Sequence, residues 1–93
     1  FRFMEAMQKA AEHQGLDADS ARALIVQTAL GAARMVQETG EMPAELRRKV
    51  CSPNGTTERA IRSFEADDLD AMVDRAMQAC RVRSIELSEE LAD

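Results

Sequence analysis

The sequence predicts an all-α fold of about five helices. Aromatic residues make up only 3% of the 93 residues, whereas Ala, Met, Leu, Glu, Gln and Arg, which favour helix, are abundant. Apolar residues recur at three- and four-residue spacing along the longer segments. Gly, Pro and Asp separate these segments, where helices are expected to end or begin. The chain is short enough to form one small domain, over residues 1–93.

Residues 1–14 carry apolar side chains at helical spacing but have no helix start signal. We therefore expect the last turns of a helix that is truncated at its start. Gly15 is expected to close it in a left-handed conformation.

The longest predicted helix follows the acidic cap residues at 17–20 and runs to about Thr39. It is apolar almost all round, so its whole circumference needs cover. Gly31 in its middle costs about 1 kcal/mol relative to Ala, which suggests that another backbone approaches there. One short chain has too few helices to provide that cover, so we expect a homodimer. A single wrapped monomer is the alternative.

Three further helices complete the predicted fold. Gly40 ends the long helix, and Pro43 begins two helical turns that run to Val50. A further helix is expected from Thr57 to about Glu65. Asp67 and Asp68 are predicted to cap a final helix that ends near Leu91, with an acidic and frayed end at Glu89, Glu90 and Asp93. The buried stripe of this last helix is predicted to consist of Leu69, Met72, Val73, Ala76, Met77 and Cys80.

Charge and composition disfavour several functions. A net charge of −5 and a sequence pI near 4.9 argue against nucleic acid or an anionic membrane as a partner. No apolar run reaches the roughly 18 residues of a membrane span. Cys51 and Cys80 are too few for a disulfide scaffold or a zinc site, and suit a reducing, cytoplasmic location. His13 is the only histidine, so no metal site or Ser-His-Asp triad is expected, and we interpret it as a surface residue.

The break at Ser52–Thr57 is the strongest candidate site. Pro53 fixes its own φ, and Asn54 and Gly55 both tolerate positive φ, so the chain is expected to turn sharply. A tight turn that leads into a helix leaves backbone N–H groups unpaired, which suits a carboxylate or a phosphate. The alternative is a plain helix–helix turn with a Ser or Thr cap. The cations at 47–49 either attract an anion or, as we favour, oppose the dipole of their helix.

These motifs, in this order, resemble the C-terminal domain of pyrroline-5-carboxylate reductases. The specific part is Pro43–Arg47 followed by Val50–Thr57, with a Ser-Pro-x-Gly-x-Thr loop between two helices. Flanking segments agree in order and spacing, namely Glu5–Ala6, Gln27–Ala33 and Arg83–Leu87. The sequence departs from the family pattern at Asn54, where the family usually has Gly, and at Asp68-Leu69, where it has Gly-Phe.

The resemblance implies an oxidoreductase of proline biosynthesis that reduces 1-pyrroline-5-carboxylate to L-proline. NADP or NAD would be held by an N-terminal Rossmann domain that this chain lacks, and the helices would interlock with a second subunit. Further assembly of the dimers into a ring is left open. Backbone N–H groups of Ser52, Gly55 and Thr56 are implied to hold the substrate carboxylate, and the Thr57 hydroxyl to act catalytically at the ring nitrogen. The implied substrate-binding residues are Val50, Ser52, Pro53, Asn54, Gly55, Thr56 and Thr57.

Two alternatives remain at this point, a non-enzymatic all-α homodimerisation module and the helical domain of a related hydroxy-acid dehydrogenase. The latter would need a lysine base, and neither Lys9 nor Lys49 has a convincing catalytic context. The four glycines, at 15, 31, 40 and 55, form neither a dinucleotide fingerprint nor a phosphate loop. We therefore expect no cofactor site in these residues and no activity from this chain alone.

Overall fold

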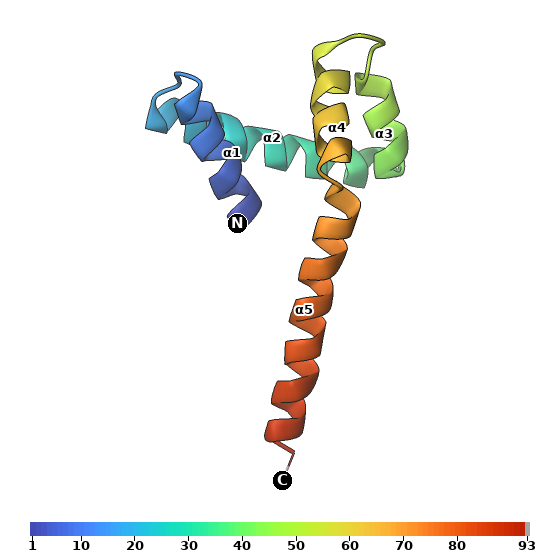
Figure 1. Ribbon diagram of the computed structural model, residues 1–93. Helices are drawn as coiled ribbons and strands as arrows, with labels where there is room; N and C mark the ends of the chain where they lie inside the picture. The colour runs from blue at the N-terminus through green and yellow to red at the C-terminus, as the bar shows by residue number, and fades with distance from the viewer. Residues whose placement is uncertain (93) are drawn as a thin grey trace. The chain divides into compact units, whose positions relative to one another are not determined.

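The computed structural model describes residues 1–92 as five helices (Figure 1). They are α1 (Arg2–His13), α2 (Ala18–Thr39), α3 (Pro43–Val50), α4 (Thr56–Ala66) and α5 (Leu69–Glu90), and no strand occurs among the described residues. The all-α prediction is confirmed, and each predicted segment corresponds to one helix. The chain divides into two compact units, Phe1–Arg48 and Lys49–Asp93. Asp93, predicted to belong to the frayed end, lies outside the described residues.

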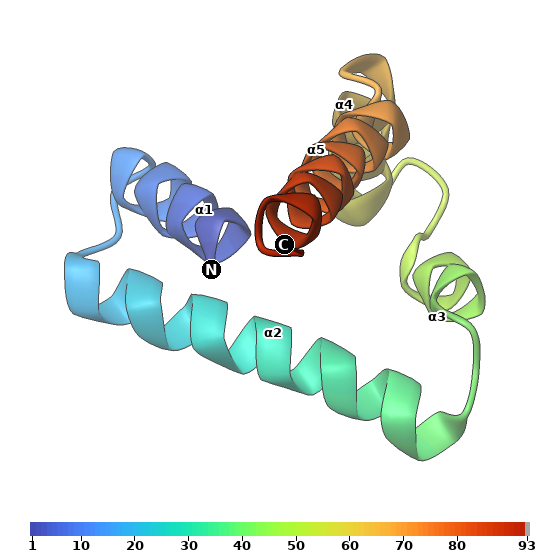
Figure 2. The ribbon, with the colours of Figure 1, turned by 90° about the horizontal axis from the view of Figure 1, so that it is seen from below.

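In the first unit, α1 packs against α2 (Figure 2). Ala21 is completely buried, and Ile25 and Val36 on the same side of α2 are half-buried. The small side chain of Ala21 allows the two helices to approach closely. After α1, Gly15 adopts a φ of 110° and donates its N–H to the carbonyl of Glu12 at 3.0 Å, as predicted for a residue that closes a helix.

Both ends of α2 have the predicted caps. The Asp17 carboxylate accepts the Ser20 N–H at 2.8 Å and the Ser20 hydroxyl at 2.9 Å, and these hydrogen bonds lower the pKa of Asp17. At the other end, Gly40 has a φ of 69° and donates its N–H to the carbonyl of Val36 at 3.2 Å. Pro43 is the first residue of α3, where its missing N–H is tolerated.

Much of α2 is left uncovered by the other residues of the first unit. Leu24, Leu30 and Met35 keep 53%, 42% and 47% of their surface exposed. Among residues 1–92, no atom outside the local backbone of α2 lies within 4 Å of the position that a Cβ would take at Gly31. Within the first unit, therefore, no other backbone approaches this glycine.

In the second unit, α4 and α5 lie nearly end to end, joined at Asp67 and Asp68 (Figures 1 and 2). Asp68 occupies the N-cap position of α5 with φ 56° and ψ 55°, and no side chain caps this helix. Asp67 is instead the C-cap of α4. The prediction is therefore confirmed for the position of Asp68, which lacks a capping side-chain hydrogen bond, and is wrong for Asp67. A capping side chain needs an extended backbone, whereas Asp68 is left-handed and provides the turn.

The predicted buried stripe of α5 is only partly covered. Leu69 and Val73 are half-buried, but Met72 and Met77 are 44% and 67% exposed, and Cys80 is exposed. For most residues of the stripe, the prediction of burial is therefore wrong within this single chain. Because α4 precedes α5 end to end instead of lying beside it, α4 can cover only the beginning of α5.

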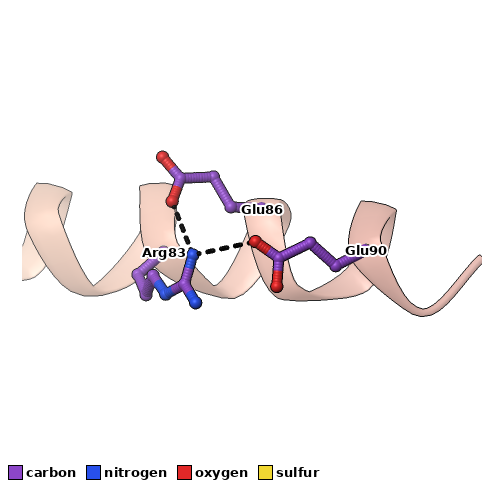
Figure 3. Close-up of polar contacts among 3 residues, drawn as sticks. All are labelled: Arg83, Glu86 and Glu90. Atoms are coloured by element: carbon purple, nitrogen blue, oxygen red, sulfur yellow. Dashed lines mark hydrogen bonds and ion pairs between the residues drawn. The ribbon is translucent and has the colours of Figure 1, made fainter.

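The C-terminal part of α5 carries a small ionic network (Figure 3). The Arg83 guanidinium contacts Glu86 at 2.9 Å and Glu90 at 3.2 Å. All three side chains are more than half exposed, so each pair contributes at most about 1 kcal/mol. Among residues 1–92, no helix combines the length and the apolar character that crossing a membrane would need.

Candidate functional site

The loop before α4 forms a tight turn over Ser52–Gly55. The Gly55 N–H donates to the Ser52 carbonyl at 2.9 Å, and Asn54 has a φ of 61°. A proline in the second position and a positive φ in the third are typical of a type II turn. The predicted sharp turn is confirmed, with Asn54 in the left-handed position.

Gly55 serves the turn through its size and not through its φ, which is −82°. A Cβ at this position would lie 3.1 Å from the Ser52 carbonyl oxygen and 3.4 Å from the Ser52 Cβ. The contact of 3.1 Å is tighter than an ordinary one, so the Ser52 carbonyl would have to shift by a few tenths of an ångström to admit a Cβ. The absence of a side chain at Gly55 therefore lets the turn close against the start of α4.

The first turn of α4 leaves backbone donors uncapped. Gly55 is the N-cap residue, and no side chain caps the helix. The first helical hydrogen bond runs from the Arg59 N–H to the Gly55 carbonyl at 3.3 Å. The N–H groups of Thr56, Thr57 and Glu58 therefore have no acceptor within the helix. The alternative prediction of a Ser or Thr cap is wrong, and this end of the helix can accept an anion.

Glu58 connects the turn to the helix, which sequence reasoning missed. Its carboxylate accepts the backbone N–H of Asn54 through Oε2, and the Arg62 guanidinium at 2.7 Å through Oε1. The Glu58 side chain is 28% exposed and that of Arg62 60%. Two signals were available, a Glu at the third helical position and an Arg four residues later. The usual capping box, however, would direct this carboxylate to the N-cap residue, one position after Asn54.

All the predicted substrate-binding residues lie between the last residue of α3 and the first turn of α4, so the fold keeps them together. Thr57 is half-buried and Thr56 is exposed, while Val50 is 56% exposed. The Gly55 N–H is engaged by Ser52 in this conformation, whereas the helix start leaves the Thr56 N–H open. The individual roles remain predictions.

A hollow that was not predicted lies between α1 and α2. It has a volume of about 390 Å³. Its wall combines four apolar residues with three polar or charged ones, and includes no Ser, Thr, Cys or His that could act as a nucleophile or base. The loop before α4 therefore stays the better candidate site. The hollow is lined by Phe1, Met4, Glu5, Gln8, Arg22, Ile25 and Val26.

Fold and loop together define an all-α domain with uncovered apolar helix faces and an anion-accepting turn at a helix start. Domains of this kind need a further surface to complete their cores. The chain belongs to the family described as pyrroline-5-carboxylate reductase dimerisation, whose pattern matches residues 1–87. The resemblance seen in the sequence is thereby confirmed.

Individual relatives agree with this assignment. The chain is 52% identical over 91 residues to the pyrroline-5-carboxylate reductase of Pseudomonas aeruginosa, covering 98% of this chain and 33% of that protein. It is 38% identical over 92 residues to pyrroline-5-carboxylate reductase 2 of Bacillus subtilis, covering 99% of this chain and 33% of that protein. The chain thus spans about a third of the length of these relatives.

Solved structures are similar over nearly the whole chain. A pyrroline-5-carboxylate reductase from Coxiella burnetii gives a TM-score of 0.89 at 46% identity, covering 94% of this chain and 32% of that one. The pyrroline carboxylate reductase of Plasmodium falciparum, in a crystal structure with NADP bound, gives 0.85 at 27% identity, covering 88% of this chain and 31% of that one.

Proposed function

We propose that this chain is the dimerisation and substrate-binding domain of a pyrroline-5-carboxylate reductase, an enzyme that reduces 1-pyrroline-5-carboxylate to L-proline with NAD(P)H. The family match over residues 1–87 supports this proposal. We place the enzyme in the cytoplasm, where its two free thiols would stay reduced. The observation that carries the substrate assignment is the uncapped start of α4 beside the Ser52–Gly55 turn.

The substrate carboxylate would bind at this helix start. The Thr56 N–H has no acceptor within the helix, and the positive end of the helix dipole favours an anion there. The Ser52 and Gly55 N–H groups would complete the cradle, with Gly55 sharing its proton between the carboxylate and the Ser52 carbonyl. Backbone donors recognise a carboxylate without an added cation, which suits this acidic chain.

The Thr57 hydroxyl would act at the ring nitrogen of the substrate. Thr57 is half-buried on the first turn of α4, next to the Thr56 N–H in sequence. A hydroxyl can donate or accept a hydrogen bond, so it can orient the imine nitrogen and assist its protonation. Reduction of an iminium depends chiefly on positioning, and a site that holds both carboxylate and nitrogen would supply it. Val50, at the end of α3, would line the pocket.

The described residues do not fit a dinucleotide. They include no strand and no glycine-rich turn that could hold a pyrophosphate. We therefore assign the nicotinamide cofactor to a separate N-terminal domain. When bound, it supplies the hydride. Residues 1–93 alone would then be inactive.

A second copy of the chain would cover the exposed apolar faces. Phe64 on α4 is 51% exposed, Val82 on α5 is 52% exposed, and Leu30 on α2 is 42% exposed. Most of the stability of a helix in a protein comes from tertiary packing of its apolar face, and little of α5 is packed within this chain. Interlocking with a second subunit would bury these side chains and complete the core. Whether such dimers form a ring would follow from the mass of the particle in solution.

A pair of neighbouring threonine variants tests the proposed function in the longer reductase chain that carries this domain. Thr57→Ala should lower kcat for NADPH-dependent reduction of pyrroline-5-carboxylate, by on the order of 10²-fold. Thr56→Ala keeps the backbone N–H and should change the rate little, which makes it the matched control. Equal rates for Thr57→Ala and wild type would refute the proposed role of the hydroxyl.

A further inference from the structure

The turn before α4 has an asparagine where its geometry favours glycine. Asn54 holds a φ of 61° as the third residue of a type II turn. A residue with a Cβ is less stable there than glycine, even though asparagine is among the best tolerated. A Pro-Asn pair fits the type I turn without positive φ, so Ser52–Gly55 has an accessible alternative.

The two turn types differ in the orientation of their central peptide, which here joins Pro53 to Asn54. In the present conformation the N–H of this peptide donates to the Glu58 carboxylate. Rotation of the peptide to the type I orientation would break that hydrogen bond. The Pro53 carbonyl would then point to the side where the Asn54 N–H now meets Glu58, which lies in the first turn of α4. A carbonyl dipole turned toward the start of α4 would repel an anion bound there.

Glu58 is held in place from its other side. Its Oε1 accepts the Arg62 guanidinium at 2.7 Å, one helical turn further along α4. With 28% of its side chain exposed, Glu58 is partly shielded from water, and a hydrogen bond to its charged carboxylate is stronger than one to a neutral acceptor. The hydrogen bond to Asn54 therefore ties the turn to the same helix that carries Thr56 and Thr57.

We propose that Glu58 is a positioning residue that compensates for Asn54, by selecting the type II orientation of the Pro53–Asn54 peptide and so keeping the turn competent to bind the substrate carboxylate. This inference rests on the proposed function of the loop. It goes further in assigning a role to Glu58, and in making that role depend on the residue at position 54.

Steady-state kinetics of the longer reductase test this dependence. Glu58→Ala should raise KM for pyrroline-5-carboxylate about five- to tenfold, with kcat changed less than about twofold. Glu58→Gln, which keeps an acceptor oxygen, should show a smaller rise. Asn54→Gly provides a second background for the same test, because glycine adopts positive φ without strain. In this background, Glu58→Ala should change KM by less than about twofold relative to Asn54→Gly alone.

The double variant separates positioning from a simple contribution to folding. A capping or stability role for Glu58 would persist in the Asn54→Gly background. The proposal would therefore be overturned if Glu58→Ala raised KM as much in the Asn54→Gly background as it does in wild type. A wild-type KM in Glu58→Ala would overturn it as well.

Amide hydrogen exchange of the same longer chain gives a readout that does not need activity. The Asn54 amide should exchange faster in Glu58→Ala than in wild type, because its acceptor has been removed. If the wild-type enzyme showed no turnover, the proposed function would fail, yet exchange at Asn54 would still test the tie to Glu58. Equal exchange in wild type and Glu58→Ala would overturn the inference.

Discussion

Replacing Gly31 distinguishes an exposed helix face from a buried subunit contact. Of the residues that the structure describes, none outside the local backbone of α2 has an atom within 4 Å of a Cβ at this position. If α2 were exposed there, Gly31→Leu should stabilise the helix, because leucine favours helix by nearly 1 kcal/mol over glycine. If the backbone of a second subunit approaches Gly31, as we propose, the added side chain has no room.

The two cases therefore predict opposite signs. Overpacking at a tight interface costs about 1–3 kcal/mol per site. A symmetric dimer contains Gly31 twice, so the loss would be about 2–6 kcal/mol per dimer, against a propensity gain of somewhat under 2 kcal/mol for the pair. Gly31→Ala serves as a graded control, because it gains the full propensity term and adds only one methyl group.

Urea unfolding at several protein concentrations, together with molecular mass in solution, measures both effects. We expect Gly31→Leu to unfold at lower urea than wild type, and to dissociate at protein concentrations at which wild type is still dimeric. A Gly31→Leu protein with the wild-type mass and equal or greater stability would refute the proposed contact.

Two further predictions concern the helix caps. Asp68→Gly should stabilise the fold by about 0.5–1 kcal/mol, because Asp68 holds a φ of 56° and its side chain makes no capping hydrogen bond; an unchanged urea midpoint would contradict this. Hydrogen bonds from Ser20 lower the pKa of Asp17 below its ordinary value of 3.8. The ionised carboxylate therefore contributes its full stability at pH values above 3.8. This contribution is lost as the pH falls through the lowered pKa of Asp17 in the folded protein. Asp17→Asn keeps an acceptor for the Ser20 N–H and should flatten this part of the pH dependence, which urea unfolding between about pH 5 and pH 2 would measure.

Local signals in the sequence were sufficient to predict the helices. Asp17, Gly40 and Pro43 each act on the backbone within a few residues, so their effects can be read without knowing the tertiary fold. The turn at Pro53-Asn54-Gly55 was predictable for the same reason.

Burial and fine capping geometry were less predictable. The periodicity of α5 marks an apolar stripe but does not say which molecule covers it, so Met77 was expected to be buried and is exposed in this chain. Asp68 is of a residue type that often caps helices, but its left-handed backbone excludes the capping hydrogen bond. The contact of Glu58 with Asn54 depends on the turn geometry, since it departs by one residue from the usual capping box.

The most direct test of the whole account is NADPH oxidation by the longer reductase chain with pyrroline-5-carboxylate as substrate. We predict clear turnover in the wild-type protein, loss of most of this activity in Thr57→Ala, and near-normal activity in Thr56→Ala. Absence of turnover with both NADPH and NADH would contradict the account, and would leave Ser52–Thr57 as a turn between two helices.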